Sequence, residues 1–248
     1  MKNWFTHGGQ NYAHYRPHYP LELSHYLSTL SPSHERAIDV GCGSGQLTRL
    51  LSVYFESVLG MDPSFDQLRH AVKQPSIQYQ SALAEQLPIN NQCADLITAA
   101  QAAHWFNLEL FYSEVKRVLK PNGILALISY GVLRIESTTV NELFQQFYYQ
   151  DIAPMWPPER RLVDEGYKTL PFPFTELNTP DLTIELEWGL MELIGYISTW
   201  SATKQALSEN KEQLVNHFFT SLQHNWPKNN EKLLVKWPIN LRVGKLLV

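Results

Sequence analysis

Residues 38–46 constrain the fold more than any other part of the chain, because they join a short apolar run to a glycine-rich loop. The segment reads Ile-Asp-Val-Gly-Cys-Gly-Ser-Gly-Gln, with glycine at every second position of the loop. Glycine suits a turn in which the backbone takes positive φ or approaches a ligand closely. The residues that follow are at helical spacing: Leu47, Leu50, Leu51 and Tyr54. The segment therefore predicts a strand, a tight turn and a helix, with a ligand at the turn.

The glycine spacing and the acid before it exclude two common nucleotide-binding loops. The form G-x-G-x-G differs from the G-x-G-x-x-G loop of dinucleotide binders. No Lys-Ser or Lys-Thr pair follows, so a phosphate-cradling P-loop is excluded as well. Asp39 stands just before the first glycine, where its charge would repel a pyrophosphate and suit a ligand with an ammonium group.

A second acid follows at the interval expected for an alternating α/β chain. Asp62 ends the short apolar run 58–62 and lies 17 residues after Gly45, close to the position of a ribose-binding carboxylate in such folds. Ser64 and Gln67 then fit the capping-box pattern at the start of a helix.

In their order and spacing, these segments resemble the class I S-adenosylmethionine (SAM) dependent methyltransferases. SAM carries an amino acid tail, a ribose, an adenine and a sulfonium, which suits a site with Asp39 and Asp62 at strand ends. The other segments that carry the resemblance are 84–88 (Ala-Glu-Gln-Leu-Pro), 95–100 (Asp-Leu-Ile-Thr-Ala-Ala), 101–106 (Gln-Ala-Ala-His-Trp-Phe) and 117–123 (Arg-Val-Leu-Lys-Pro-Asn-Gly).

The chain also resembles one small-molecule branch of this family, which includes the fungal trans-aconitate methyltransferases and bacterial relatives. Four segments carry this likeness: 12–20 (Tyr-Ala-His-Tyr-Arg-Pro-His-Tyr-Pro), 103–106, 197–200 (Ile-Ser-Thr-Trp) and 237–243 (Trp-Pro-Ile-Asn-Leu-Arg-Val). The resemblance covers nearly the whole chain. It specifies the cofactor and the fold more closely than the methyl acceptor.

Composition narrows the classes of partner. The 248 residues are 44% hydrophobic, which is enough for a sizeable core, and the formal net charge of −4 argues against an electrostatic nucleic-acid surface. The two cysteines, Cys42 and Cys93, provide neither a disulfide framework nor metal-ligand spacing. No secretory signal and no apolar run of about 20 residues is visible. We therefore expect a cytoplasmic protein that binds a small molecule, without a metal, a membrane or a nucleic acid, and the oligomeric state stays open.

The pattern along the chain predicts an α/β fold of one domain. We expect an N-terminal cap over 1–34 with a helix near 20–30, a SAM-binding core over 35–130, a lid or substrate insertion over 131–180, and completion of the sheet over 181–248. The predicted strands are 36–41, 56–61, 76–80, 94–100, 123–130, 181–188 and 232–243. The predicted helices are 44–54, 64–73, 83–87, 107–120, 137–150, 189–200 and 204–224.

Strands that alternate with helices in this way indicate a parallel sheet covered on both faces. The resemblance implies a Rossmann-like sheet of seven strands, mostly parallel, with an antiparallel last strand. The insertion is rich in aromatic residues, and six prolines lie between 153 and 180. It reads either as a lid over the site or as a surface loop whose aromatic side chains pack on the sheet.

Residues at the ends of the predicted strands are the candidates for binding the cofactor. The glycines would bring the loop backbone to the methionine part of SAM, Asp62 would accept the ribose hydroxyls, and Leu83 with Ala84 would face the adenine. The full predicted set is Tyr12, Arg16, Asp39, Gly41, Cys42, Gly43, Gly45, Gln46, Asp62, Pro63, Leu83, Ala84, Glu85, Ala100 and Gln101.

Residues after the fourth strand and in the insertion are the candidates for contact with the acceptor: His104, Trp105, Tyr130 and Trp156. His104 reads either as a general base or as a packed histidine beside Trp105. Arg16 reads either as a clamp on a carboxylate or as an anchor of the N-terminal cap.

The sequence therefore indicates an enzyme that transfers the methyl group of SAM to a small molecule and releases S-adenosylhomocysteine. A carboxylate oxygen suits a site without an obvious catalytic dyad, since a carboxylate is already ionised at neutral pH. Two alternatives stay open: O- or C-methylation of an aromatic or quinone-like ring, and a SAM-binding protein without catalysis. An exocyclic base amine is disfavoured, because residues 100–103 lack the Asn/Asp-Pro-Pro-aromatic motif.

Overall fold

A parallel sheet forms the first half of the protein, as the alternating pattern predicts. The computed structural model describes residues 15–227 and 231–246. Its central strands follow the order β3-β2-β1-β4-β5, with β9 antiparallel to β5. The bounds are β1 Arg36–Val40, β2 Ser57–Met61, β3 Ile77–Gln80, β4 Ala94–Ala100, β5 Leu119–Tyr130 and β9 Leu233–Lys245.

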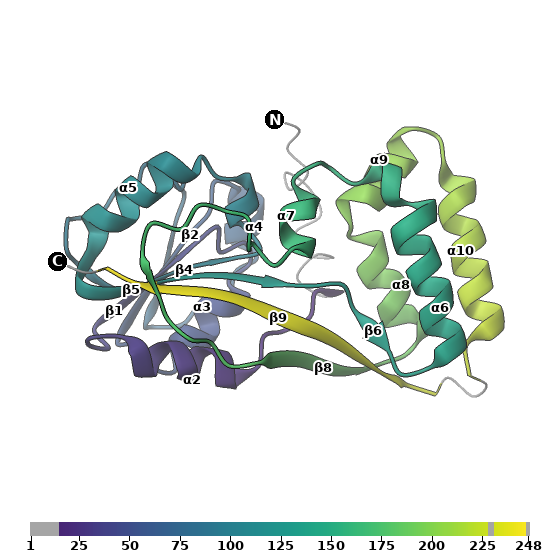
Figure 1. The fold of residues 1–248 in the computed structure, drawn as a ribbon, viewed down its shortest axis with the longest axis horizontal. Helices are drawn as coiled ribbons and strands as arrows, with labels where there is room; N and C mark the ends of the chain where they lie inside the picture. The colour runs from purple at the N-terminus through teal and green to yellow at the C-terminus, as the bar shows by residue number, and fades with distance from the viewer. Residues whose placement is uncertain (1–14, 228–230, 247–248) are drawn as a thin grey trace.

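Helices cover both faces of this sheet (Figure 1). Successive side chains of a strand point to opposite faces. In β1, Ile38 packs with the side chains of α5, and Ala37 packs in the cluster on the other face, which includes residues of α2 and α3. The helices of this half, with one short 3-10 turn, are α2 Leu21–Leu30, α3 Gln46–Leu51, α4 Phe65–Arg69, η1 Ala103–Trp105 and α5 Leu108–Val118.

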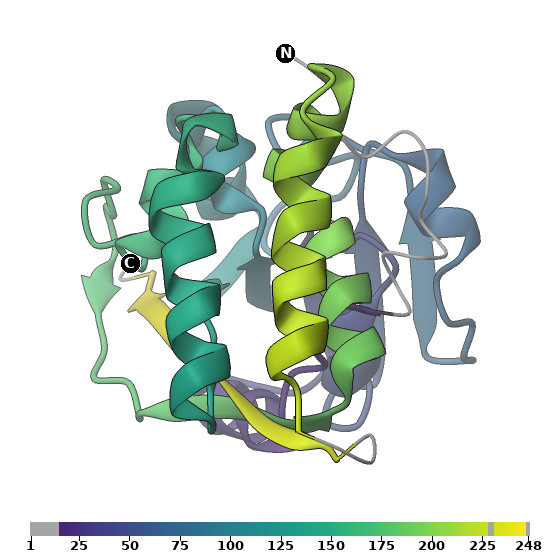
Figure 2. The ribbon, with the colours of Figure 1, turned by 90° about the vertical axis from the view of Figure 1, so that its right-hand side faces the viewer.

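A helical bundle forms the other end of the molecule, and the long strand β9 reaches from the sheet to it (Figure 1). Figure 2 shows α6 and α10 side by side on the outer face of this bundle. Inside it, the rings of Phe147 and Phe218 stack at 3.8 Å between centroids. The remaining elements of the chain are β6 Arg134–Ile135, α6 Thr138–Gln146, the π-helix η2 Phe147–Asp151, the 3-10 helix η3 Ala153–Met155, α7 Arg160–Asp164, β7 Thr175–Glu176, β8 Leu182–Trp188, α8 Leu190–Ser198, α9 Ser201–Ser208 and α10 Glu212–Asn225.

Two predicted helices are wrong. Residues 83–87 form a turn closed by a bridge between Leu83 and Gln86, and Pro88 then disfavours helix. The helix expected over 204–224 is two helices, because Asn210 takes a φ of +59° and ends the first of them.

The sheet also differs from the prediction in one strand boundary and in its number of strands. β5 begins at Leu119 instead of 123, since Leu119 pairs with Ala94 across a register shift. In the described residues, the sheet has nine strands instead of seven, because the short strands β6 and β7 also pair with β9.

The proline-rich insertion is less irregular than predicted and is anchored to the sheet. Val163, Tyr167 and Leu170 are buried in the core on the α5 face. Arg242 of β9 donates hydrogen bonds to the carbonyl oxygens of Tyr167 and Leu170, at 3.1 and 2.5 Å. This half of the insertion is therefore a fixed wall that packs on the sheet. In the described residues, no helix is both long and apolar enough to cross a bilayer.

Candidate active site

The candidate site is a cavity of about 350 Å³ at the carboxyl ends of β1, β2 and β4. The chain order reverses between β1 and β4, and ligands of open α/β sheets bind at such a switch point. The residues that line the cavity are Tyr19, Asp39, Gly41, Cys42, Gly43, Ser44, Gln46, Leu47, Asp62, Pro63, Ser64, Gln67, Leu83, Ala100, Gln101, Ala102, Trp105, Phe106 and Tyr130.

The glycine loop bends around this cavity because its three glycines take positive φ. Gly41 has a φ of +69°, and a Cβ there would lie 2.5 Å from the Cβ of Ala102. Gly45 has a φ of +80° and immediately precedes α3, where a Cβ would lie 2.1 Å from the hydroxyl of Tyr79. No other residue fits these two positions without displacing a neighbour.

Asp62 fixes the loop from the neighbouring strand. Its two carboxylate oxygens accept hydrogen bonds from the backbone N–H of Gly43, at 2.9 Å, and of Ser64, at 2.8 Å. Burial raises the pKa of Asp62, and these two bonds oppose that shift. Each oxygen has a further lone pair, so the carboxylate can also accept from the two hydroxyls of a ribose.

Asp39 is buried below the loop with 1% of its surface exposed. The hydroxyls of Thr48 and Thr98 donate to its two oxygens, at 2.6 and 2.7 Å. Burial raises the pKa of Asp39 to about 6, against the effect of these hydrogen bonds. A cation in the cavity would favour the ionised form.

Two glutamines bring unpartnered polar atoms to the cavity. In the part of the chain that the structure describes, Nε2 of Gln46 and Oε1 of Gln67 are buried and have no hydrogen-bond partner. Gln46 can donate to a carboxylate, and Gln67 can accept from a hydroxyl or an amine. Ser64 caps α4 by accepting from Gln67 N–H, but the Gln67 side chain does not complete the predicted capping box. An amino acid tail and a ribose would supply the missing partners, so the chemistry of these residues is compatible with SAM.

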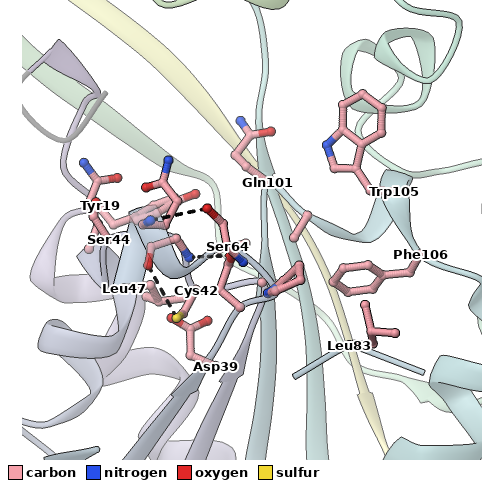
Figure 3. A pocket seen from close by; sticks show the side chains of 18 of the residues that line it. Tyr19, Asp39, Cys42, Ser44, Leu47, Ser64, Leu83, Gln101, Trp105 and Phe106 are labelled. Carbon is pink, nitrogen blue, oxygen red and sulfur yellow. Dashed lines mark hydrogen bonds between the residues drawn. The ribbon is translucent and has the colours of Figure 1, made fainter. Parts of the chain in front are cut away.

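Apolar side chains form the wall opposite the loop. Figure 3 shows Leu83 and Phe106 on this side, across the cavity from Asp39 and Cys42. Leu83 borders the cavity and is 57% exposed, so its side chain is accessible to a ligand there. This slot suits the flat face of an adenine.

The structure brings together most of the predicted cofactor residues. Twelve predicted residues line the cavity: Asp39, Gly41, Cys42, Gly43, Gln46, Asp62, Pro63, Leu83, Ala100, Gln101, Trp105 and Tyr130. The others that are described do not line it: Arg16, Gly45, Ala84, Glu85, His104 and Trp156. Tyr12 lies outside the described residues.

Glu85 is engaged outside the cavity, and the thiol of Cys42 is not activated. Glu85 accepts a hydrogen bond from the backbone N–H of Asn107, at 2.8 Å, which turns its carboxylate towards the start of α5. The pKa of the Cys42 thiol is raised well above its ordinary value by burial and by the charges of Asp39 and Asp62, so this cysteine is unreactive.

The sequence analysis missed seven lining residues, namely Tyr19, Ser44, Leu47, Ser64, Gln67, Ala102 and Phe106. Most of them are neighbours of predicted residues, and a strand-end rule could have included them. Gln67 could have been found as a polar residue on the cavity side of α4.

A second group of residues is connected to the cavity through the side chain of Arg16. Four rings, which we call the aromatic cluster, pack together at 5.2 to 5.5 Å between centroids: Tyr148, Trp156, Tyr196 and Trp200. Arg16 joins this cluster to the cavity. Its guanidinium lies over the ring of Tyr196, at 5.3 Å, and donates to the hydroxyl of the cavity residue Tyr130, at 3.0 Å.

His104 lies beside this cluster and behind Trp105. Its Nδ1 is 2.8 Å from the hydroxyl of Tyr167, and its ring is 4.7 Å from that of Trp105. Burial and the charge of Arg160 lower the pKa of His104 to about 3. The imidazole therefore stays neutral and is a weak base.

Arg160 begins α7, which Figure 1 shows between the sheet and the bundle. Its guanidinium lies over the rings of Trp156 and Tyr148, at 4.9 and 5.7 Å, and pairs with Asp164. The sequence analysis did not single out Arg160. The spacing of four residues between Arg160 and Asp164 was the available signal.

Comparisons with known proteins show the family to which the chain and its fold are similar. The profile of a methyltransferase domain matches residues 38–127. A candidate methyltransferase of Dictyostelium discoideum is 35% identical over 95% of this chain and 92% of its own length. A solved structure of a candidate type II methyltransferase from Anaeromyxobacter dehalogenans is 38% identical, covers 94% of this chain and 98% of its own, and superimposes with a TM-score of 0.87. A Saccharomyces cerevisiae protein named as an S-adenosylmethionine-dependent methyltransferase is 33% identical, over 48% of this chain and 45% of its own length.

Proposed function

Since the chain belongs to the class I SAM-dependent methyltransferases, we propose that it methylates a carboxylate oxygen of a small-molecule acceptor. The observation that carries this proposal is the position of His104, which the sequence offered as a general base: it does not line the cavity, its Nδ1 lies 2.8 Å from the hydroxyl of Tyr167, and its pKa is lowered to about 3. A phenol must lose a proton and an amine must be in its free-base form to accept the methyl group, whereas a carboxylate is already ionised at neutral pH. The other acids near the cavity, Asp39 and Asp62, are engaged with the glycine loop and its neighbours.

SAM supplies a methyl group that is already activated for transfer to a nucleophile. The chain's own residues then have to bind, orient and exclude water. Asp39, Asp62 and the backbone of the glycine loop would hold the polar groups of the cofactor, and Leu83 with Phe106 would hold its base. Trp105 and Tyr130 border the space in front of them, where the acceptor oxygen would lie.

The acceptor chemistry can be read from the lability of the product. The purified protein is incubated with SAM labelled in its methyl group and with a metabolite extract, and the labelled product is isolated and treated with mild alkali. A methyl ester releases the label as methanol, whereas methyl ethers, amines and carbon-bound methyl groups retain it. We expect release. Retained label would contradict the carboxylate and favour the aromatic alternative, and no label in any product would favour the non-catalytic one.

A further inference from the structure

The Arg160 guanidinium is fixed by one of its nitrogens alone. Nε donates to Asp164, at 3.0 Å, and to the hydroxyl of Tyr148, at 2.9 Å, and this hydroxyl donates to Asp164 in turn. Together with the rings of Tyr148 and Trp156, these contacts hold the guanidinium plane in one orientation.

The two terminal nitrogens of Arg160 are left available. In residues 15–227 and 231–246, neither of them makes a hydrogen bond or an ion pair, although the side chain is only 16% exposed. The indole N–H of Trp156, whose ring lies under the guanidinium, is buried and also has no acceptor there. Four guanidinium N–H groups and one indole N–H therefore lack acceptors at one place.

The neighbour Arg161 shows what an ordinary arginine of this helix does. Its side chain is 78% exposed and pairs with Glu165 on the surface. Arg160 is instead turned inwards, close enough that its charge lowers the pKa of His104 and acts on Tyr196. Packing α7 on the sheet does not require free guanidinium nitrogens, because Val163 of the same helix is buried in the core.

We propose that Arg160 binds an anionic group of the acceptor other than the group that is methylated. The fork of two terminal nitrogens matches the two oxygens of a carboxylate or of a phosphate. A carboxylate held in this way shares its lone pairs with several donors and is a poor nucleophile, so the methylated atom lies elsewhere on the acceptor. This inference takes from the proposed function only the position of the acceptor. Binding of an anionic group by Arg160 is compatible with methylation of any other atom of the acceptor.

Three variants separate this role from a structural one. Arg160→Gln removes the charge, Arg160→Lys keeps the charge but loses the fork, and Arg161→Gln is the matched control on the same helix. Each protein is saturated with S-adenosylhomocysteine and titrated calorimetrically with glutarate and, separately, with inorganic phosphate at constant ionic strength. The two titrations distinguish a site that binds a carboxylate from one that binds a phosphate.

We expect at least one anion to bind to the wild type and to Arg161→Gln with the same affinity. Binding should weaken about 10–100-fold in Arg160→Gln and less in Arg160→Lys. An affinity of folded Arg160→Gln within twofold of the wild type overturns the proposal, as does the absence of saturable binding of both anions to the wild type. If Arg160→Gln does not fold, the Arg160→Lys variant decides. An affinity equal to that of the wild type in Arg160→Lys overturns the proposal that the two terminal nitrogens of Arg160 bind the anion. A labelled product that resists alkali would contradict the carboxylate acceptor and leave the Arg160 result unaffected.

Discussion

At the scale of single residues, buried polar atoms around the cavity are arranged for a ligand more than for stability. Asp39 is the clearest case, because its folded-state pKa of about 6 lies above its ordinary value of 3.8. The folded protein therefore holds this proton more tightly than the unfolded chain does. The stability that Asp39 contributes is full below about pH 4 and is lost as the pH rises through 6.

Asp39→Asn should raise the stability of the ligand-free protein at pH 8 and weaken the binding of S-adenosylhomocysteine. The shift of about two pKa units corresponds to about 3 kcal/mol, or several degrees in Tm for a chain of this size. Thermal unfolding of both proteins at pH 8 and pH 5 checks this, and the gain should shrink at pH 5. A variant that is less stable than the wild type at pH 8 would show that the ionised carboxylate of Asp39 does not destabilise the folded protein.

Gln67→Leu should leave the ligand-free protein at least as stable and weaken the binding of S-adenosylhomocysteine about tenfold. The amide oxygen of Gln67 is a buried acceptor without a donor, and loss of such a group is neutral or stabilising until a ligand supplies the donor. Calorimetry and thermal unfolding measure the two effects. Gln223→Leu, on the exposed surface of α10, is the control; equal affinities in the wild type and Gln67→Leu would remove Gln67 from the site.

His104→Gln should change turnover by less than about tenfold and leave its pH profile unaltered, once an acceptor is known. The imidazole stays neutral above pH 5 and lies behind Trp105, so it orients the wall and does not accept a proton. Turnover from pH 5 to 9 is measured for the wild type, His104→Gln and the exposed His224→Gln. A loss of 10²–10⁴, with a missing limb in the pH profile, would make His104 a general base after all.

At the scale of elements, the insertion is the segment for which the sequence left two interpretations open, a lid over the site and a surface loop packed on the sheet. The burial of Val163 and Tyr167 in the core and the hydrogen bonds from Arg242 of β9 favour the packed loop for this part of the insertion. We therefore expect residues 160–176 to resist proteolysis equally with and without S-adenosylhomocysteine. Limited proteolysis followed by mass spectrometry is the test. Strong protection of this segment by the ligand would support the interpretation of the insertion as a lid.

The strand-loop-helix units could be predicted because their signals are local. The glycine loop, the acids at strand ends and the Asn107 cap of α5 are read directly from neighbouring residues, and the Asn107 side chain does accept from Leu110 N–H. The helix expected over 83–87 overlooked Pro88, which disfavours helix in the residue before it, and the segment is also held by a contact of Glu85 with the start of α5 that joins residues 22 positions apart. Local propensity carries no information about such a contact.

At the scale of the whole molecule, the cofactor half of the site follows from the order of the strands, and the acceptor half depends on contacts between distant segments. Arg16 reaches Tyr130 across 114 positions of sequence, and the aromatic cluster combines the insertion with α8 and the residues that follow it. These contacts form only when the bundle packs against the sheet. This is why the sequence indicated SAM from a few residues but did not reveal Arg160.

The account depends most on the claim that the cavity at the ends of β1, β2 and β4 is the site of SAM. Calorimetric titration of the purified protein with S-adenosylhomocysteine tests this directly, with NAD as the comparison ligand and Asp62→Ala as the variant. We predict one site per chain for S-adenosylhomocysteine, no saturable binding of NAD, and an affinity at least tenfold weaker in Asp62→Ala, since two charge-assisted hydrogen bonds to the ribose would be lost. An unchanged affinity in folded Asp62→Ala, or binding of NAD in place of S-adenosylhomocysteine, would contradict the account.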